Sequence, residues 1–110
     1  MKPFAQGVLG EMRAANYVKK QGMRVLERRY RASHGEIDLI AQDGDTLVFI
    51  EVKARPTGTL GAGAQAVNGE KRRHLRFAAQ QYLQSHSAGQ VRFDVIEITA
   101  SGLRHIKNAF

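Results

Sequence analysis

Two acidic residues and a lysine near the middle of the chain have the types and spacing of a metal-dependent site. Asp38 lies in the stretch Gly35–Ile40, and Glu51 and Lys53 lie two residues apart in the stretch Phe49–Lys53. Carboxylate oxygens are the ligands that Mg²⁺ and Mn²⁺ prefer, and an ion held in this way can activate a water molecule. The lysine adds a group that can orient that water or accept its proton. We therefore expect a Mg²⁺ or Mn²⁺ site at Asp38 and Glu51.

A β-hairpin is expected to position these side chains. The segments Gly35–Gln42 and Asp45–Arg55 have the composition and alternation of strands. Asp43-Gly44 between them predicts a type I′ turn, in which residue 42 pairs with residue 45.

This register decides which side chains meet. It places Glu36 opposite Glu51 and Asp38 opposite Phe49, so that Asp38 and Glu51 are diagonal neighbours whose carboxylates can converge. Strand side chains alternate with a period of two. The polar face therefore carries Glu36, Asp38, Glu51 and Lys53. The apolar face, expected in the core, carries Ile37, Leu39, Val48, Ile50 and Val52.

Converging carboxylates repel one another unless a cation lies between them, which leaves two interpretations open. A divalent ion at Asp38 and Glu51 removes the repulsion. Alternatively, Lys53 and Arg55 neutralise Glu51 and Glu36 as plain cross-strand ion pairs. The cross-strand position of Asp38 favours the ion.

Two expected helices each turn one charged side chain toward the sheet. At about 100° per residue, Glu11 falls inside an apolar stripe between Ala15 and Val18. On the second helix, Lys71 points inward beside Leu75. Both residues are candidates for the same site, and snorkelling from the edge of each stripe is the alternative. The outward face of the second helix carries Arg72, Arg73 and Arg76.

Charge is distributed unevenly along this basic chain. Lys and Arg number 17 against 10 Asp and Glu, and the isoelectric point is about 10.3. Residues 1–34 carry eight basic and two acidic side chains, residues 35–55 carry two and five, and residues 56–110 carry seven and three. Basic flanks suit nucleic acid and an acidic centre suits a cation, with an ordinary solvated surface as the alternative. The expected phosphate contacts are Arg28, Arg29, Arg31, Lys71, Arg72, Arg73 and Arg76.

The other elements follow from helical periodicity and turn residues. We expect helices at Phe4–Gln21 and Ala64–Ser85, loops at Arg31–His34 and Pro56–Gly63, and further strands at Met23–Tyr30, Val91–Thr99 and Leu103–Ile106. Gly22 ends the first helix, and Asn68 can cap a new segment of the second. The order α-β-β-β-α-β-β predicts an α/β fold, with a central mixed β-sheet flanked by helices, in a single domain of residues 1–110.

Composition excludes several classes of protein and site. The chain has no cysteine, so disulfides, cysteine-based zinc sites and thiol nucleophiles are excluded. No apolar run is long enough to span a membrane, and residues 1–10 lack the apolar region of a secretory signal, so we expect a cytoplasmic protein without a membrane partner. The four histidines show no metal-ligand spacing and are expected to be solvated. Asp94 and Glu97 are expected to be structural.

The arrangement of three acidic residues and a lysine on a helix and two strands resembles that of the restriction-endonuclease-like PD-(D/E)xK nuclease superfamily, and its pattern is similar to that of archaeal Holliday-junction resolvases. The four residues are Glu11, Asp38, Glu51 and Lys53. Ile37 stands where the superfamily name has a proline. The whole chain resembles the uncharacterised YraN-type bacterial family. The residues that carry this resemblance are Gly7-x-x-Gly10-Glu11, Gly35-Glu36-Ile37-Asp38-Leu39-Ile40, Phe49-Ile50-Glu51-Val52-Lys53, Arg92-Phe93-Asp94-Val95 and Asn108-Ala109-Phe110.

The resemblance implies a restriction-endonuclease-like fold and a role for each residue. Asp38 and Glu51, with the Val52 carbonyl, would hold a divalent ion, and Glu11 a second ion or the first through water. Lys53 would orient or deprotonate the attacking water. The implied activity is metal-dependent hydrolysis of branched or structured DNA, and the alternative is a catalytically silent nucleic-acid-binding module. A homodimer is a further expectation, through the last hairpin and the tail Ala109-Phe110.

Overall fold

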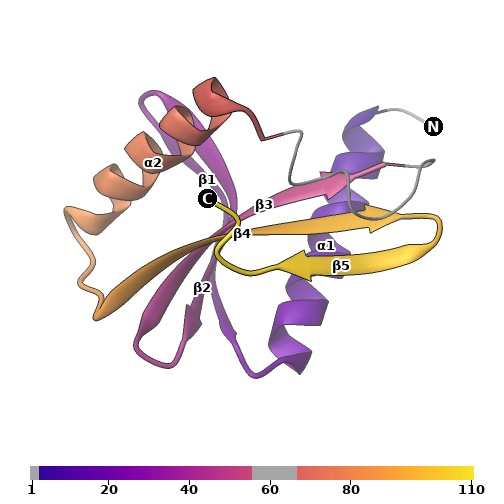
Figure 1. Cartoon of the computed structure of the whole chain (residues 1–110), viewed down its shortest axis with the longest axis horizontal. Coiled ribbons are helices and arrows are strands. Elements are labelled where there is room, and N and C mark those ends of the chain that lie inside the picture. The colour runs from indigo at the N-terminus through magenta and orange to yellow at the C-terminus, as the bar shows by residue number, and fades with distance from the viewer. Residues whose placement is uncertain (1–2, 56–66) are drawn as a thin grey trace.

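The computed structural model describes residues 3–55 and 67–110. Two helices and five strands follow one another in the expected order α-β-β-β-α-β-β (Figure 1). Their bounds are α1 Pro3–Lys20, β1 Arg24–Ala32, β2 Gly35–Asp43, β3 Thr46–Ala54, α2 Gly69–Leu83, β4 Gln90–Thr99 and β5 Gly102–Ile106. No helix within the described ranges is both long and apolar enough to cross a lipid bilayer.

The five strands form one mixed sheet with a helix on each face. Their order is β1-β2-β3-β4-β5, and β3 and β4 are the parallel pair. Parallel neighbours need a crossover, which here contains α2. One core cluster joins α1 to the sheet through Ala14, Ala15, Val18, Leu39, Ala41, Val48 and Ile50. The other joins α2 to the opposite face through Leu75, Ala78, Ala79, Tyr82, Ile40, Phe49 and Val95. The α/β architecture expected from the sequence is therefore confirmed.

A glycine lets α1 approach the sheet closely. A Cβ atom added at Gly10 would lie 2.5 Å from the Cβ of Ala54 on β3, closer than two carbon atoms can pack. After α1 ends at Lys20, Gly22 takes a φ of +89°, which confirms the predicted helix stop. The close approach at Gly10 brings the neighbouring Glu11 to the edge of β3.

We expect Gly10→Ala to lower the free energy of unfolding by about 1–3 kcal/mol, because the added methyl group overpacks the contact with Ala54. This sign is unusual, since glycine to alanine in a free helix stabilises by about 1 kcal/mol. Urea denaturation measures the change. Gly69→Ala is the matched control, because a Cβ at this first residue of α2 meets nothing closer than 3.7 Å. Equal effects at the two positions would contradict the close packing of α1.

The start of α2 confirms the predicted cap at Asn68. Its side-chain oxygen accepts a hydrogen bond of 3.0 Å from the backbone N–H of Lys71. The cap satisfies one of the free N–H groups of the first turn and orients Lys71 toward the sheet. Residues 67 and 68 are not helical, which agrees with the predicted interruption. The predicted loop Pro56–Gly63 and helix start at residues 64–66 lie outside the described residues.

The end of β1 differs from the prediction. The predicted loop at Arg31–His34 is wrong, because β1 continues to Ala32 and pairs there with Gly35, leaving a two-residue turn at residues 33 and 34. Gly35 takes a φ of +137°, and a Cβ there would lie 2.8 Å from the carbonyl oxygen of His74. The β1–β2 hairpin thus packs tightly against α2.

The predicted hairpin register is shifted by two residues. Asp43 pairs with Thr46, so the turn consists of Gly44 and Asp45, with a φ of +60° at Gly44. A glycine at the first turn position and a residue without positive φ at the second fit a type II′ turn. The predicted pairing of Glu36 with Glu51 and of Asp38 with Phe49 is therefore wrong. Because the shift is even, each side chain keeps its predicted face where the ladder is regular.

The strands β2 and β3 separate at Asp38. Their last pair is Leu39 with Ile50, although the register would bring Asp38 level with Glu51. Beyond this point β2 bends, and Ile37 packs in the α2 cluster while Leu39 packs in the α1 cluster. The predicted common apolar face is thus correct for Leu39 but wrong for Ile37.

The tail at the end of the described chain packs against the molecule. Ala109 and Phe110 pack on the α2 cluster, and the Ala109 N–H donates a 2.8 Å hydrogen bond to the carbonyl of Phe93. The Phe110 and Phe93 rings lie 5.3 Å apart. The tail is therefore half-buried and not freely exposed, and the dimer contact stays a prediction.

Candidate functional site

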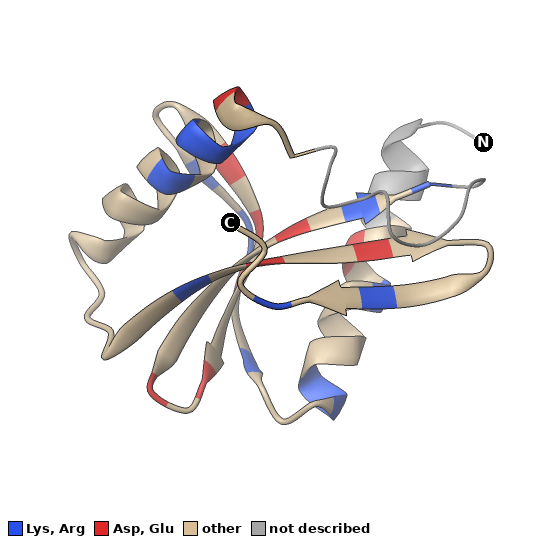
Figure 2. Cartoon of the chain, viewed as in Figure 1, with Lys and Arg blue, Asp and Glu red and all other residues tan. Residues whose placement is uncertain are grey.

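The acidic residues named from the sequence meet where β2 leaves β3. The Val52 N–H donates a 2.8 Å hydrogen bond to Asp38 Oδ2, so the carboxylate takes the place of a carbonyl in the interrupted ladder. The hairpin register brings Asp38 level with Glu51, close enough for Glu51 to act on the pKa of Asp38. Acidic positions on β2, β3 and β4 lie near the centre of the molecule, where the strands overlap in this view (Figure 2).

The electrostatics of Asp38 show a carboxylate pair that shares a proton. Burial, the hydrogen bond with Glu51 and the negative charge of Glu51 together raise the pKa of Asp38 to about 9. The hydrogen bond from Val52 acts in the opposite direction but does not outweigh them. Two buried carboxylates this close cannot both be ionised without a compensating cation.

Glu51 receives its positive partner from α2. The Glu51 side chain is 3% exposed, and Lys71 Nζ lies 3.0 Å from its Oε2. Burial lowers the pKa of the Lys71 ammonium, but the attraction of Glu51 outweighs burial and the pKa is raised. The contact falls outside hydrogen-bond geometry, so Glu51 Oε2 is buried without a hydrogen bond. The inward orientation predicted for Lys71 is confirmed.

The alternative ion pairs expected within the hairpin do not form. Arg55 pairs with Glu97 at 2.6 Å, not with Glu36. Lys53 is half-buried, and its side chain makes no hydrogen bond or ion pair with any residue of the described ranges. The observed register explains the difference for Arg55, because β3 lies parallel to β4 and Arg55 continues it beside Glu97.

Glu11 is paired with an arginine that the sequence assigned to phosphate binding. The Arg29 Nε–H donates a 2.7 Å hydrogen bond to Glu11 Oε2, and the Glu11 side chain is 15% exposed. The inward position predicted for Glu11 is confirmed. The hydrogen bond to Glu11, and then its negative charge, raise the pKa of the Arg29 guanidinium, with smaller contributions from Glu36 and Asp38.

Arg29 is the site residue whose position was missed. Arg28 pairs with Leu39 and Tyr30 pairs with Ile37, which leaves Arg29 level with Asp38 between them. Its backbone has a φ of +53°, rare for a residue other than glycine. A two-residue turn at residues 33 and 34 would have predicted this register, but the basic run around Arg29 favoured a simple phosphate-binding surface.

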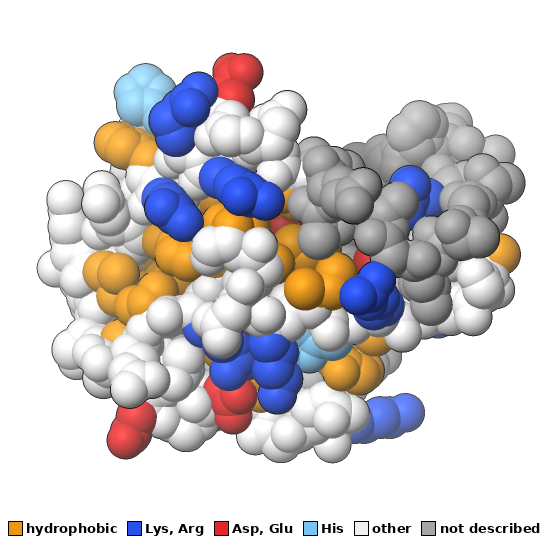
Figure 3. Space-filling model, in the orientation of Figure 1, with side chains coloured by type: hydrophobic (Ala, Val, Ile, Leu, Met, Phe, Trp, Pro, Cys, Tyr) orange, Lys and Arg blue, Asp and Glu red, His pale blue; other side chains and the backbone are white. Residues whose placement is uncertain are grey.

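The other predicted phosphate-binding residues lie on β1 and α2. Arg28, Arg31, Arg73 and Arg76 are exposed, whereas Arg72 is half-buried. Arg72 donates to the Val67 carbonyl at 2.9 Å, and its guanidinium and that of Arg76 both lie over the Phe110 ring. On the face shown in Figure 3, Lys and Arg side chains lie over α2 beside hydrophobic side chains. The α2 arginines therefore also contribute to packing.

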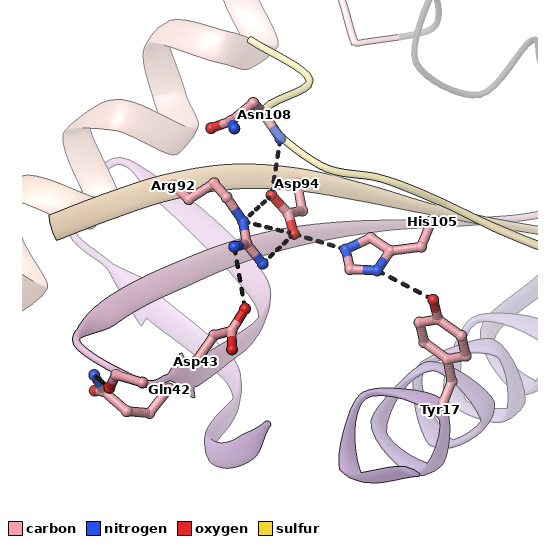
Figure 4. A network of polar contacts seen from close by, with 8 residues as sticks. Tyr17, Gln42, Asp43, Arg92, Asp94, His105 and Asn108 are labelled. Carbon is pink, nitrogen blue, oxygen red and sulfur yellow. Dashed lines mark hydrogen bonds and ion pairs between the residues drawn. The ribbon is translucent and has the colours of Figure 1, made fainter. Parts of the chain in front are cut away.

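A second polar network lies apart from these acids, around Asp94 of β4 (Figure 4). Asp94 is fully buried and accepts hydrogen bonds from Arg92, from His105 at 2.6 Å and from the backbone N–H of Asn108. Burial raises the pKa of Asp94, but these hydrogen bonds outweigh it and the pKa is lowered. His105 also contacts the Tyr17 hydroxyl of α1 at 3.3 Å.

This network corrects one expectation and supports another. The side chain of His105 is 4% exposed, so the expectation that it is solvated is wrong. Asp94 is fully buried and satisfied by hydrogen bonds from Arg92, His105 and Asn108, in keeping with the expected structural role. The burial of His105 could not be predicted from the alternation of side chains along β5, because that pattern does not show that α1 covers the residue.

The donor set at Asp38 and Glu51 fits a hard divalent cation. Both groups are carboxylates, and Glu51 Oε2 is buried without a hydrogen bond. Without a metal, Asp38 holds a proton, and a cation bound between the two groups could replace that positive charge. Glu11 is held by Arg29, and no three acidic or histidine side chains of the described residues form a ready metal-holding group.

Comparison with known proteins confirms the resemblance of the chain to the YraN-type family. The model of the uncharacterised protein family UPF0102 matches residues 10–98, which include Glu11, Asp38, Glu51 and Lys53. The chain belongs to the UPF0102 family, the YraN-type family. A UPF0102 protein of Alkaliphilus oremlandii is 43% identical over 94% of this chain and 96% of its own length. One of Herminiimonas arsenicoxydans is 45% identical over 94% and 84%, and one of Persephonella marina 38% over 100% and 97%.

Proposed function

We propose that this UPF0102 protein is a metal-dependent nuclease that hydrolyses phosphodiester bonds in branched or otherwise structured DNA. The observation that carries the proposal is the juxtaposition of the half-buried Asp38 with the buried Glu51, which raises the pKa of Asp38 to about 9. Placing a second carboxyl group beside a buried carboxylate costs stability, even with Lys71 beside Glu51, so their juxtaposition favours a functional role. The proposed fold type is restriction-endonuclease-like, in keeping with the mixed sheet between two helices.

Each residue of the site has a role that its surroundings support. Asp38 and Glu51 would hold a Mg²⁺ or Mn²⁺ ion, which supplies polarisation of the scissile phosphate and activation of water. Lys53, on the same strand as Glu51 and without a partner among the described residues, would orient the attacking water or take its proton. Lys71, 3.0 Å from Glu51, would place its positive charge where negative charge develops.

The DNA partner is supported by the exposed cations that surround the acids. Arg28, Arg31, Arg73 and Arg76 are exposed on β1, which pairs with β2 on either side of Asp38, and on α2, whose Lys71 reaches Glu51. Arginines of this kind bind backbone phosphates and carry no sequence information, which suits a nuclease that recognises shape. The same surface would serve a catalytically silent binding module, so cleavage has to be tested directly.

The deciding experiment incubates the full chain with linear, flapped and four-way DNA, and with RNA of the same sequences. We expect Mg²⁺- or Mn²⁺-dependent cleavage of the branched DNA in preference to the linear duplex, and none with EDTA. Lys53→Ala is the variant that tests the water-orienting role, with cleavage reduced by about 10²-fold or more and binding retained. Binding without cleavage of any substrate would instead support the silent module.

A further inference from the structure

The ion pair with Arg29 engages the carboxylate of Glu11, which the proposed metal site needs. Glu11 Oε2 accepts a 2.7 Å hydrogen bond from Arg29 Nε, and Glu11 also acts electrostatically on Asp38. Arg29 lies level with Asp38 on the neighbouring strand β1, so the Arg29–Glu11 ion pair is next to the proposed site. While Arg29 holds Glu11, that carboxylate is not available to a cation beside Asp38.

Arg29 is also within reach of a ligand, unlike a buried structural arginine. Its side chain is 31% exposed, whereas Glu11 is 15% exposed. It lies on β1 between the exposed Arg28 and the half-buried Tyr30, and Arg31, which follows Tyr30, is also exposed. Arg29 therefore belongs to the surface that would meet phosphates. A guanidinium pairs with phosphate as readily as with carboxylate, and both are planar forked contacts.

The backbone conformation of Arg29 is one that an arginine does not favour by itself, so contacts with its surroundings hold it. The φ of +53° is unfavourable for an arginine, and such conformations persist where the surroundings hold them, often at functional sites. This conformation lies at the point of β1 level with Asp38. The strained residue, the acid pair and the separation of β2 from β3 therefore coincide.

We propose that Arg29 is a latch that couples nucleic-acid binding to assembly of the metal site. In the free protein Arg29 neutralises Glu11, and in the complex it transfers to a backbone phosphate and releases Glu11 toward the cation at Asp38. The inference rests on the proposed function and adds a regulatory step to it. Because coupling between two ligands is reciprocal, DNA raises the affinity for the metal and the metal raises the affinity for DNA by the same factor.

The test measures Mn²⁺ binding by electron paramagnetic resonance, with and without a short DNA duplex of non-cleavable phosphorothioate linkages. In Arg29→Gln, which keeps the Cβ atom and so the backbone strain, we expect Mn²⁺ to bind about five-fold more tightly than in the native chain without DNA. The duplex is expected to raise Mn²⁺ affinity in the native chain by a similar factor and not in the variant.

The matched control is Arg28→Gln, which removes the same charge from the neighbouring exposed residue. Arg28 has no hydrogen bond or ion pair in the described part of the chain. We expect weaker DNA binding in this control with the metal affinity and its coupling to DNA unchanged. The double variant Glu11→Gln with Arg29→Gln should lose the gain in Mn²⁺ affinity, because the released carboxylate is then absent.

The outcomes separate the latch from the nuclease itself. If Arg29→Gln and Arg28→Gln bind Mn²⁺ equally and Asp38→Asn abolishes that binding, the latch is refuted while the metal site stands. If neither the native chain nor Arg29→Gln binds Mn²⁺ with or without DNA, the proposed metal site fails, and the latch fails with it. A gain confined to Arg29→Gln that depends on Glu11 supports the latch.

Discussion

Asp38→Asn is expected to abolish divalent-cation binding and any cleavage that depends on it, while the metal-free fold stays intact. The amide keeps the shape of the carboxyl group and can still accept the 2.8 Å hydrogen bond from Val52. It removes one of the two charges that would hold the ion. Loss of a residue that only hydrogen-bonds to a metal ligand lowers metal affinity or activity by about 10–100-fold, so loss of a ligand itself should lower them further. Calorimetric titration with Mn²⁺ and the DNA cleavage assay measure the two effects.

The stability of the same variant distinguishes a metal ligand from half of a structural ion pair. We expect the metal-free free energy of unfolding to stay unchanged or to rise by about 1 kcal/mol, because the uncharged amide lies beside Glu51 without having to take up a proton. A structural pair would instead lose about 3–5 kcal/mol. Asp45→Asn, at an exposed position in the β2–β3 turn, controls for the loss of one negative charge. A marked loss of stability with metal binding retained would exclude the assignment of Asp38 as a ligand.

The pH dependence of metal-free stability gives an independent check. The folded protein raises the pKa of Asp38 from 3.8 to about 9, so between these values the folded state holds a proton that the unfolded state has lost. The stabilisation linked to this proton is complete below pH 3.8 and disappears as the pH rises toward 9, with a slope of at most about 1.4 kcal/mol per pH unit. Urea denaturation across this range should show the decline in the native chain and its loss in Asp38→Asn.

Asp94→Asn is expected to have the opposite signature, a large loss of stability without a direct loss of metal binding. It removes the negative charge that Arg92 and His105 share in a site where Asp94 is fully buried. Breaking a buried ion pair on one side costs about 3–5 kcal/mol, because the remaining cation stays buried. Because hydrogen bonds lower the pKa of Asp94, its contribution to stability is present above pH 3.8 and is lost as the pH falls through its lower, folded-state pKa.

Asp43→Asn is the matched control for this prediction. Asp43 binds the same arginine at 3.1 Å, but its side chain is 37% exposed. An exposed pair contributes only about 0–1 kcal/mol, so the control should lose little. Denaturant titration of both variants at neutral pH compares them, and Mn²⁺ titration below the unfolding transition tests the metal site. Equal losses of stability, or loss of metal binding from a folded Asp94→Asn, would contradict a purely structural network.

Local pattern was sufficient to predict the elements and their order. Helical periodicity placed Glu11 and Lys71 on inward faces, and both orientations are confirmed. Turn and cap residues predicted the helix stop at Gly22 and the cap at Asn68. These features depend on interactions within a few residues, which the periods of helices and strands express directly in the sequence. The spacing of Asp38, Glu51 and Lys53 likewise put them on neighbouring strands, whatever the register.

Register and ion pairing depended on contacts between distant segments. Gly44 took the first turn position, which shifted the hairpin by two residues and brought Asp38 level with Glu51. The separation of β2 from β3 then moved Ile37 to the opposite core cluster from Leu39. A local pattern could not predict this bend, because it depends on how the β1–β2 hairpin packs against α2.

The sequence by itself determined which chemical groups the protein possesses and which face of its element most of them occupy. The tertiary structure decided which side chain pairs with which acid. Arg29 comes from β1 to Glu11, Lys71 comes from α2 to Glu51, and His105 is buried against Asp94 beneath α1. The reason is physical. Alternation and helical period act along the chain, whereas Coulomb attraction and burial depend on distances in space between residues that the sequence separates.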